Sequence, residues 1–98
     1  MNIVKDLNGT TLTIALEGRL DTTTSPEANK ELETLGNVEN LIWDFEKLIY
    51  ISSAGIRVLL IAQKAMNRIG GSMKIINANE DVKEIFEVTG CNEMFAIE

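Results

Sequence analysis

The sequence predicts an α/β fold with one mixed sheet, built from an N-terminal hairpin and later parallel strands. Two observations support this prediction. Apolar and polar residues alternate around a turn near the N-terminus, and three helical segments are then separated by short apolar runs. Strand-helix-strand order makes the neighbouring strands parallel, with right-handed crossover connections.

The alternating segment is predicted to be a β-hairpin centred on Asn8-Gly9. After the turn, Leu12, Ile14 and Leu16 alternate with less apolar residues. A period of two places these three side chains on one buried face of a strand, and Asn-Gly is a favoured hairpin turn. We expect Gly18 to end this second strand.

A first helix is predicted to begin at Ser25 and to run to about Leu35. Ser25 as N-cap, Pro26 as the first helical residue and Glu27 in the first turn are all typical of a helix start. Gly36 is expected to stop the helix.

A central strand and a second, longer helix are predicted to follow. The short apolar run Leu41–Phe45 suits a strand buried on both faces, with Asp44 near its C-terminal end. After Ser53, apolar residues recur at helical spacing as far as Ile69, and Gly70-Gly71 is a typical C-terminal signal.

The last part of the chain predicts a strand, a helix and a short extended segment. Met73–Ile76 reads as a strand, and Asn79 is expected to cap a third helix that ends at Gly90. Met94–Ile97 reads as a final short strand or tail. The residues of the third helix expected to face inward are Val82, Ile85, Phe86 and Val88.

The composition suits one domain over residues 1–98. The 98 residues are 45% hydrophobic, enough for one core near the lower size limit for independent folding. A net charge of −6 argues against nonspecific binding to nucleic acid or to an anionic membrane, both of which need clustered cations. Partners are therefore expected to be proteins.

Targeting and redox features predict a cytoplasmic protein. The N-terminal residues do not resemble a signal peptide, and no apolar run reaches the length of a membrane-spanning helix. Cys91, the single cysteine, has no partner for an internal disulfide.

No motif for catalysis, for a cofactor or for a metal is found. Without histidine, neither a Ser-His-Asp set nor the commonest metal ligand is available, and glycine-rich nucleotide motifs are missing. The carboxylates that follow Asn79 read as the solvated face of a helix. Asp21 and Asp44, which both lie at strand ends, are candidates for acid-base work, but loop bracing is the favoured interpretation. We expect no enzymatic activity.

The segment around Ser52 and Ser53 is the candidate functional site. If Ser53 is the N-cap of the second helix, then Ala54, Gly55 and Ile56 form its first turn and nothing bulky shields the hydroxyl. The helix N-terminus would also favour a phosphate there. A purely structural cap is the alternative.

The second helix has a broader apolar band than one packing face requires. Its core side is expected to be buried, while Ile56, Leu60 and Ile61 are candidates for a surface that faces a partner.

The whole chain resembles the STAS domain family, specifically the free-standing anti-sigma-factor antagonists. Four segments carry the resemblance: Gly18–Asp21, Trp43–Phe45, Tyr50–Ile56 and Val88–Gly90. The resemblance implies a mixed sheet with helices mainly on one face, and an exposed phosphorylatable loop beside the second helix.

The resemblance also implies a partner-switching function. Antagonists of this family bind an anti-sigma factor that is a serine kinase of the histidine-kinase-like ATPase fold, and so release a sigma factor. Phosphorylation, which falls on Ser53 by residue matching, reverses the binding, and a PP2C-type phosphatase resets it. Asp21 matches a family aspartate close to the loop, and Asp44 is expected to support the loop. The implied partner interface comprises Asp21, Ser52, Ser53, Ala54, Gly55, Ile56, Arg57 and Leu60.

The sequence departs from the family pattern at three positions, which leaves alternatives open. Ser52 stands where many members have aspartate, so it is a second candidate acceptor. Ala54 replaces a common hydroxyl residue, and Arg57 replaces a frequent glycine. A STAS-fold accessory subunit of a transporter or sensory complex, without a phosphoswitch, is the alternative function. A phosphoaspartate receiver using Asp44 is disfavoured, because no acidic pair follows the first strand.

Overall fold

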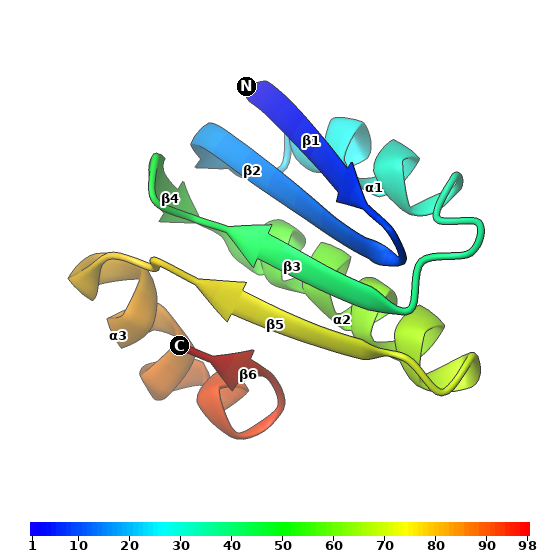
Figure 1. Cartoon of the computed structure of the whole chain (residues 1–98). Helices are drawn as coiled ribbons and strands as arrows, with labels where there is room; N and C mark the ends of the chain where they lie inside the picture. The colour runs from blue at the N-terminus through cyan, green and yellow to red at the C-terminus, as the bar shows by residue number, and fades with distance from the viewer.

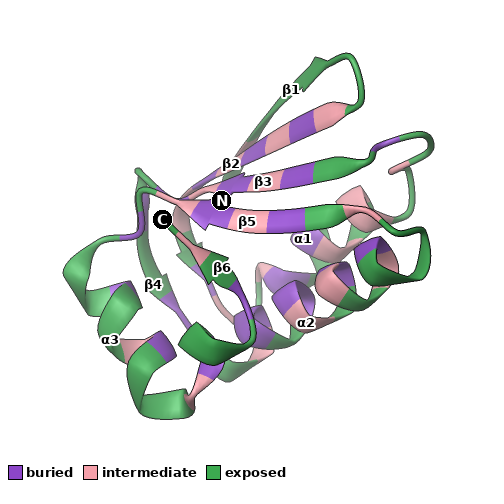
Figure 2. Ribbon diagram, turned by 60° about the horizontal axis from the view of Figure 1, so that its bottom comes forward, coloured by how far each residue is buried: buried purple, intermediate pink, exposed green.

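A computed structural model describes residues 1–98, and its strands form one six-stranded sheet in the order β1-β2-β3-β5-β6, with β4 paired to β2. Figure 2 shows the three helices on one side of this sheet. The predicted mixed α/β fold is therefore confirmed. In chain order the elements are β1 (Asn2–Asn8), β2 (Thr11–Leu20), α1 (Ser25–Leu32), β3 (Asn40–Asp44), β4 (Leu48–Ile51), α2 (Ser53–Arg68), β5 (Ser72–Ile76), α3 (Glu80–Thr89), the 3-10 helix η1 (Cys91–Glu93) and β6 (Ala96–Ile97).

The predicted N-terminal hairpin is confirmed, although its turn lies one residue later than the expected Asn8-Gly9. β1 and β2 pair antiparallel from Asn2↔Glu17 to Asn8↔Thr11, so Gly9 and Thr10 make the turn. Gly9 has a φ of 64°, which glycine adopts without strain. Along β2, buried Leu12, Ile14 and Leu16 alternate with less buried neighbours, as the period of two requires.

Gly18 does not end β2, contrary to the prediction. The strand continues to Leu20 through a register shift between Gly18 and Arg19, and Gly18 has a φ of 107°. A glycine here marks a bulge, because an L side chain would strain the backbone at this angle. The bulge lets β2 pair with one partner strand before Gly18 and with another from Gly18 onward.

Those partners are β3 and β4, both parallel to β2. β3 pairs with residues 11–15 of β2, and β4 pairs with residues 18–20 (Figure 1). The sequence did not predict β4, because its burial does not alternate. Leu48 and Ile51 are buried, whereas Ile49 and Tyr50 between them are 60% and 36% exposed.

The core lies between the sheet and the helices. It is a cluster of 23 buried residues whose largest members are Trp43, Phe45 and Phe86, none of them exposed at all. α2 contributes its sheet-facing side, including Val58, Leu59, Ala62 and Met66.

Two apolar residues that the helical patterns included are on the surface: Val88, which was expected to face the core, and Ile69, the last residue of the pattern in α2. Val88 is 80% exposed and Ile69 is 58% exposed. Val88 lies two residues beyond buried Phe86, which is about 200° round the helix, so it points away from the core. Ile69 is the C-cap of α2 and lies outside its last helical turn.

The predicted N-cap of α1 is wrong by one residue and its predicted end by three. The N-cap is Thr24, without a side-chain capping bond, so Ser25 is already helical. Ser25 is buried, and its hydroxyl donates to the carbonyl of Asp21. The helix ends at Leu32, and a turn connects it to β3.

The predicted caps of α3 are confirmed. The side chain of Asn79 accepts a hydrogen bond from Val82 N at 2.8 Å, and Gly90 closes the helix with a left-handed φ of 78°. Asn79 Nδ2 also donates to the Leu48 carbonyl at 3.0 Å. This second bond joins α3 to β4.

The first turn of α2 packs directly on β2 and β4 at Gly55. A Cβ atom at this position would lie 2.8 Å from Leu20 Cγ, Leu20 O and Ile51 Cγ1. Because one of these atoms is backbone, rotation of a side chain cannot relieve the clash. Glycine is therefore required for the close approach of helix and sheet.

We predict that Gly55→Ala lowers the free energy of unfolding by about 1–3 kcal/mol, the usual cost of forcing an extra group into a packed site. Urea unfolding followed by circular dichroism measures this change. The control is Ser53→Ala on the exposed side of the same helical turn, where about 0.5 kcal/mol or less is expected. Equal stability of Gly55→Ala and the native protein would contradict the close packing.

Candidate functional site

The end of β4 holds the candidate site against the end of β2. Because the two strands are parallel, their C-terminal ends lie together, and Leu20 pairs with Ile51. Ser52 N then donates to Leu20 O at 2.9 Å. This bond places Asp21, the next residue after Leu20, beside the start of α2.

Ser52, and not Ser53, is the N-cap of α2, which corrects the prediction. Ser52 has an extended backbone, with φ −100° and ψ 177°, and its Oγ accepts from Gly55 N at 3.4 Å. Ser52 O accepts the first helical bond from Ile56 N at 2.9 Å. The bond to Leu20 holds Ser52 in the extended conformation of a cap, and the helix starts at Ser53, one residue earlier than expected.

The two hydroxyls therefore have different surroundings. Ser52 is half-buried and its oxygen takes part in the cap. Ser53 is the first helical residue, and it is exposed. An anion on Ser53 would lie at the helix N-terminus, where free amides and the helix dipole favour negative charge.

Asp21 is held by the turn that leads into α1. Its Oδ1 accepts from Thr23 N at 3.0 Å, from Thr24 N at 3.2 Å and from the Thr24 hydroxyl at 3.2 Å. The bond from Thr24 N, followed by those from Thr23 N and the Thr24 hydroxyl and by the charge of Arg19, keeps the pKa of Asp21 below its usual value. Asp21 is thus a fixed negative charge beside the site.

Arg19 and Tyr50 extend the site across β2 and β4, and the sequence did not reveal either of them. The Arg19 guanidinium lies 4.4 Å from the centre of the Tyr50 ring, and its Nε is 3.8 Å from Asp21 Oδ2. Arg19 and Tyr50 are cross-strand partners. The pair was missed because it exists only if residues 48–51 form a strand.

Asp44 braces a different turn. Its Oδ1 accepts from Glu46 N and from Asn77 Nδ2, both at 3.1 Å. Asp44 pairs with Ala15 on β2, whereas Asp21 follows the end of that strand, six residues further along the chain. They do not form an acid-base pair. Asp44 supports the turn between β3 and β4, two elements before Ser53.

The other residues of the expected interface vary in their exposure. Arg57 is exposed and Ala54 and Leu60 are half-buried, so these three remain available to a partner. Gly55 is buried, and Ile56 is 8% exposed and belongs to the core. Ile61, also considered for a partner surface, is 44% exposed.

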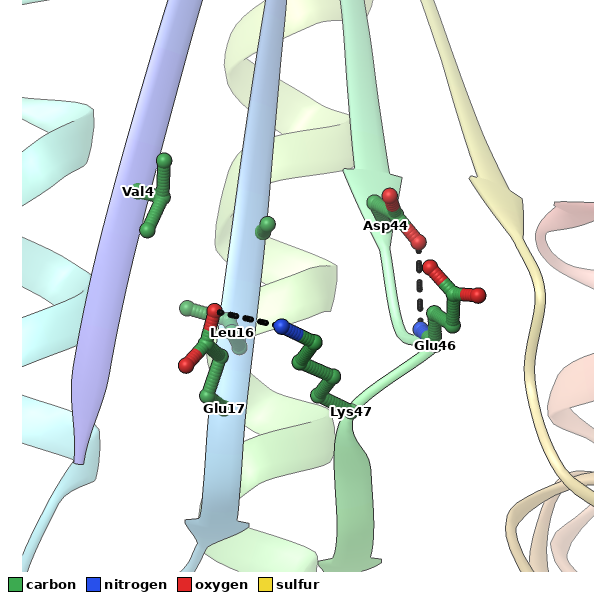
Figure 3. A pocket seen from close by; sticks show the side chains of 7 residues that line it. Val4, Leu16, Glu17, Asp44, Glu46 and Lys47 are labelled. Carbon is green, nitrogen blue, oxygen red and sulfur yellow. Dashed lines mark hydrogen bonds and ion pairs between the residues drawn. The ribbon is translucent and has the colours of Figure 1, made fainter.

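A pocket of about 160 Å³ lies away from this site, on the sheet face opposite the helices (Figure 3). Lys47 Nζ is 3.9 Å from Glu17 Oε2, and Asp44 Oδ1 accepts from the backbone amide of Glu46. The pocket shares no residue with the Ser53 site. No group of three or more Asp, Glu, Cys or His side chains is placed to hold a metal ion. None of the helices has the length and apolar character needed to cross a membrane.

Comparison with known proteins relates the chain to several antagonists. BtrV of Bordetella bronchiseptica, provisionally named an anti-sigma factor antagonist, is 26% identical over 99% of this chain and 85% of its own length. Among solved structures, unphosphorylated SpoIIAA superposes with a TM-score of 0.78 at 20% identity, covering 99% of this chain and 87% of its own.

Two further structures share the fold. The phosphorylated form of SpoIIAA from Bacillus gives a TM-score of 0.77 at 21% identity, covering 99% of this chain and 91% of its own. An anti-sigma factor antagonist from Mycobacterium paratuberculosis gives 0.85 at 13% identity, covering 98% and 83%. The STAS domain family matches residues 2–98. This chain therefore belongs to the STAS domain family.

Proposed function

We propose that this protein is an anti-sigma factor antagonist, switched by phosphorylation of Ser53. In its bare form it binds an anti-sigma factor, a serine kinase of the histidine-kinase-like ATPase fold, in the cytoplasm, and so releases a sigma factor. A PP2C-type phosphatase restores the bare form. It acts as a binding module and catalyses no reaction of its own.

The exposure of Ser53 is the observation that supports this proposal most directly. A kinase must reach the hydroxyl oxygen, and Ser53 is exposed at the first position of α2. The neighbouring Ser52 has its oxygen in the helix cap. The relationship to BtrV, and the existence of a phosphorylated form of SpoIIAA with the same fold, agree with this function.

The fold also explains how phosphorylation would act without unfolding the protein. A phosphate adds about −1.5 to −2 charges and three acceptor oxygens. At the N-terminus of α2 this charge is locally favourable, so the fold is retained. On the outer surface it places a second negative group beside Asp21, which is already ionised. The partner surface therefore changes while the core does not.

Incubation with the kinase and ATP is expected to add one phosphate, located on Ser53 by mass spectrometry of proteolytic fragments. Ser53→Ala should abolish the modification. The matched control is Ser52→Ala, which should still be modified although the lost cap costs about 1 kcal/mol of stability. Phosphate on Ser52, or no phosphate at all, would refute the assignment.

Ser53→Asp is expected to weaken binding of the anti-sigma factor about a hundredfold or more, while its thermal midpoint stays within about 5 °C of the native value. Isothermal titration calorimetry and thermal melts measure the two quantities. Ser53→Ala, which adds no charge, is the binding control. Native affinity of Ser53→Asp would favour a structural accessory role instead, and a large loss of stability would show that the charge acts on the fold.

A further inference from the structure

The exposed face of α2 has a charge opposite to that of the rest of the protein. The helix contains Arg57, Lys64 and Arg68 and no acidic residue. The whole chain has 9 Lys and Arg against 15 Asp and Glu, so the remainder carries six basic and 15 acidic side chains. A concentration of positive charge on one helix is therefore a local feature of a strongly acidic molecule.

These three cations lie on one stripe that starts at the phosphoacceptor. At 100° per residue, a sector about 100° wide contains Ser53, Leu60, Lys64, Arg57, Arg68 and Ile61. Arg57, Lys64 and Arg68 are exposed, Leu60 is half-buried and Ile61 is 44% exposed. We call this set the α2 stripe. It faces away from the core side of the helix.

The cations of the α2 stripe have no carboxylate partner within the molecule. The four ion pairs of the structure use Lys5, Arg19, Lys47 and Lys74. No carboxylate oxygen therefore lies within 4.0 Å of Arg57, Lys64 or Arg68. Their charge remains available to an external group.

We infer that the α2 stripe is the docking surface for the anti-sigma factor, and that the partner presents an acidic surface with an apolar contact for Leu60 and Ile61. This inference rests on the proposed function, because it gives the chemistry of the same partner. Charge complementarity selects the partner, since an acidic surface is repelled by the rest of this protein and attracted only here. Leu60 and Ile61, which lie at the two edges of the stripe with the cations between them, favour a protein surface.

The α2 stripe also gives the phosphate on Ser53 a direct electrostatic effect. Arg57 is four residues after Ser53 on the same helix face, the spacing at which opposite charges interact. A phosphate of about −1.5 to −2 charges offsets half or more of the three positive charges. Phosphorylation would then weaken the attraction for an acidic partner as well as obstruct the loop.

The test is a charge reversal within the α2 stripe, compared with the same reversal elsewhere. Binding of the purified anti-sigma factor is measured by calorimetry at low and high salt. Lys64→Glu, more than two turns from Ser53, is expected to weaken binding about tenfold, and the loss should shrink at high salt because exposed charges are screened. The matched control is Lys83→Glu on α3, also exposed and unpaired, for which less than about a twofold change is expected.

Equal affinities of the two variants would overturn the inference, while a block of binding by Ser53→Asp in the same experiment would leave the proposed function intact. If no anti-sigma factor binds at all, the proposed function fails. A helical peptide of glutamate and leucine is then titrated into the isotope-labelled protein and followed by nuclear magnetic resonance. Amide shifts confined to α2 would support the acidic docking surface, and shifts elsewhere, or none, would overturn it.

Phosphatidylserine vesicles provide the remaining comparison. The native protein is expected not to sediment with them. Outside α2 the 15 acidic side chains outnumber the six basic ones, and this net negative charge is repelled by an anionic bilayer. Sedimentation that Lys64→Glu abolishes would overturn the inference in favour of a membrane surface.

Discussion

The parallel pairing of β2 with β4 is the constraint on which the candidate site depends. It brings Leu20 beside Ile51 and gives Ser52 N a carbonyl at 2.9 Å, so the chain remains extended until the helix begins. Gly55 then lets the first helical turn approach the strands closely. Without this pairing, Asp21 would not be held beside the cap of α2 and the exposed Ser53.

The charges near Ser53 divide into two groups with different supports. Asp21 and Arg19 belong to the end of β2 and are held by bonds to the α1 turn and by Tyr50. The cations of the α2 stripe project from a helix face and have no internal partner. A negative charge at Ser53 would lie between these two groups, so it would add to the charge of Asp21 and offset the charge of the α2 stripe.

Sequence patterns predicted the fold where local signals agree with tertiary packing. Alternation along Leu12, Ile14 and Leu16 determined the hairpin, and Asn79 and Gly90 determined α3, because each signal acts within a few residues. The patterns failed where the decisive contact is distant. β4, the continuation of β2 beyond Gly18 and the choice of Ser52 as cap all depend on pairing between residues about 30 apart in the sequence. The Arg19–Tyr50 contact was missed for the same reason, and Asp44 proved to brace a neighbouring turn.

The side chain of Asn79 stabilises β4, the four-residue strand that leads into the candidate site. β4 has a strand neighbour only on its β2 side, and a four-residue strand with one free edge frays easily. Asn79 occupies that edge at Leu48 O while it anchors α3 through Val82 N. One amide group thus joins the C-terminal helix to the strand that leads into Ser52, so the segment before Ser53 is held by β2 on one side and by the cap of α3 on the other.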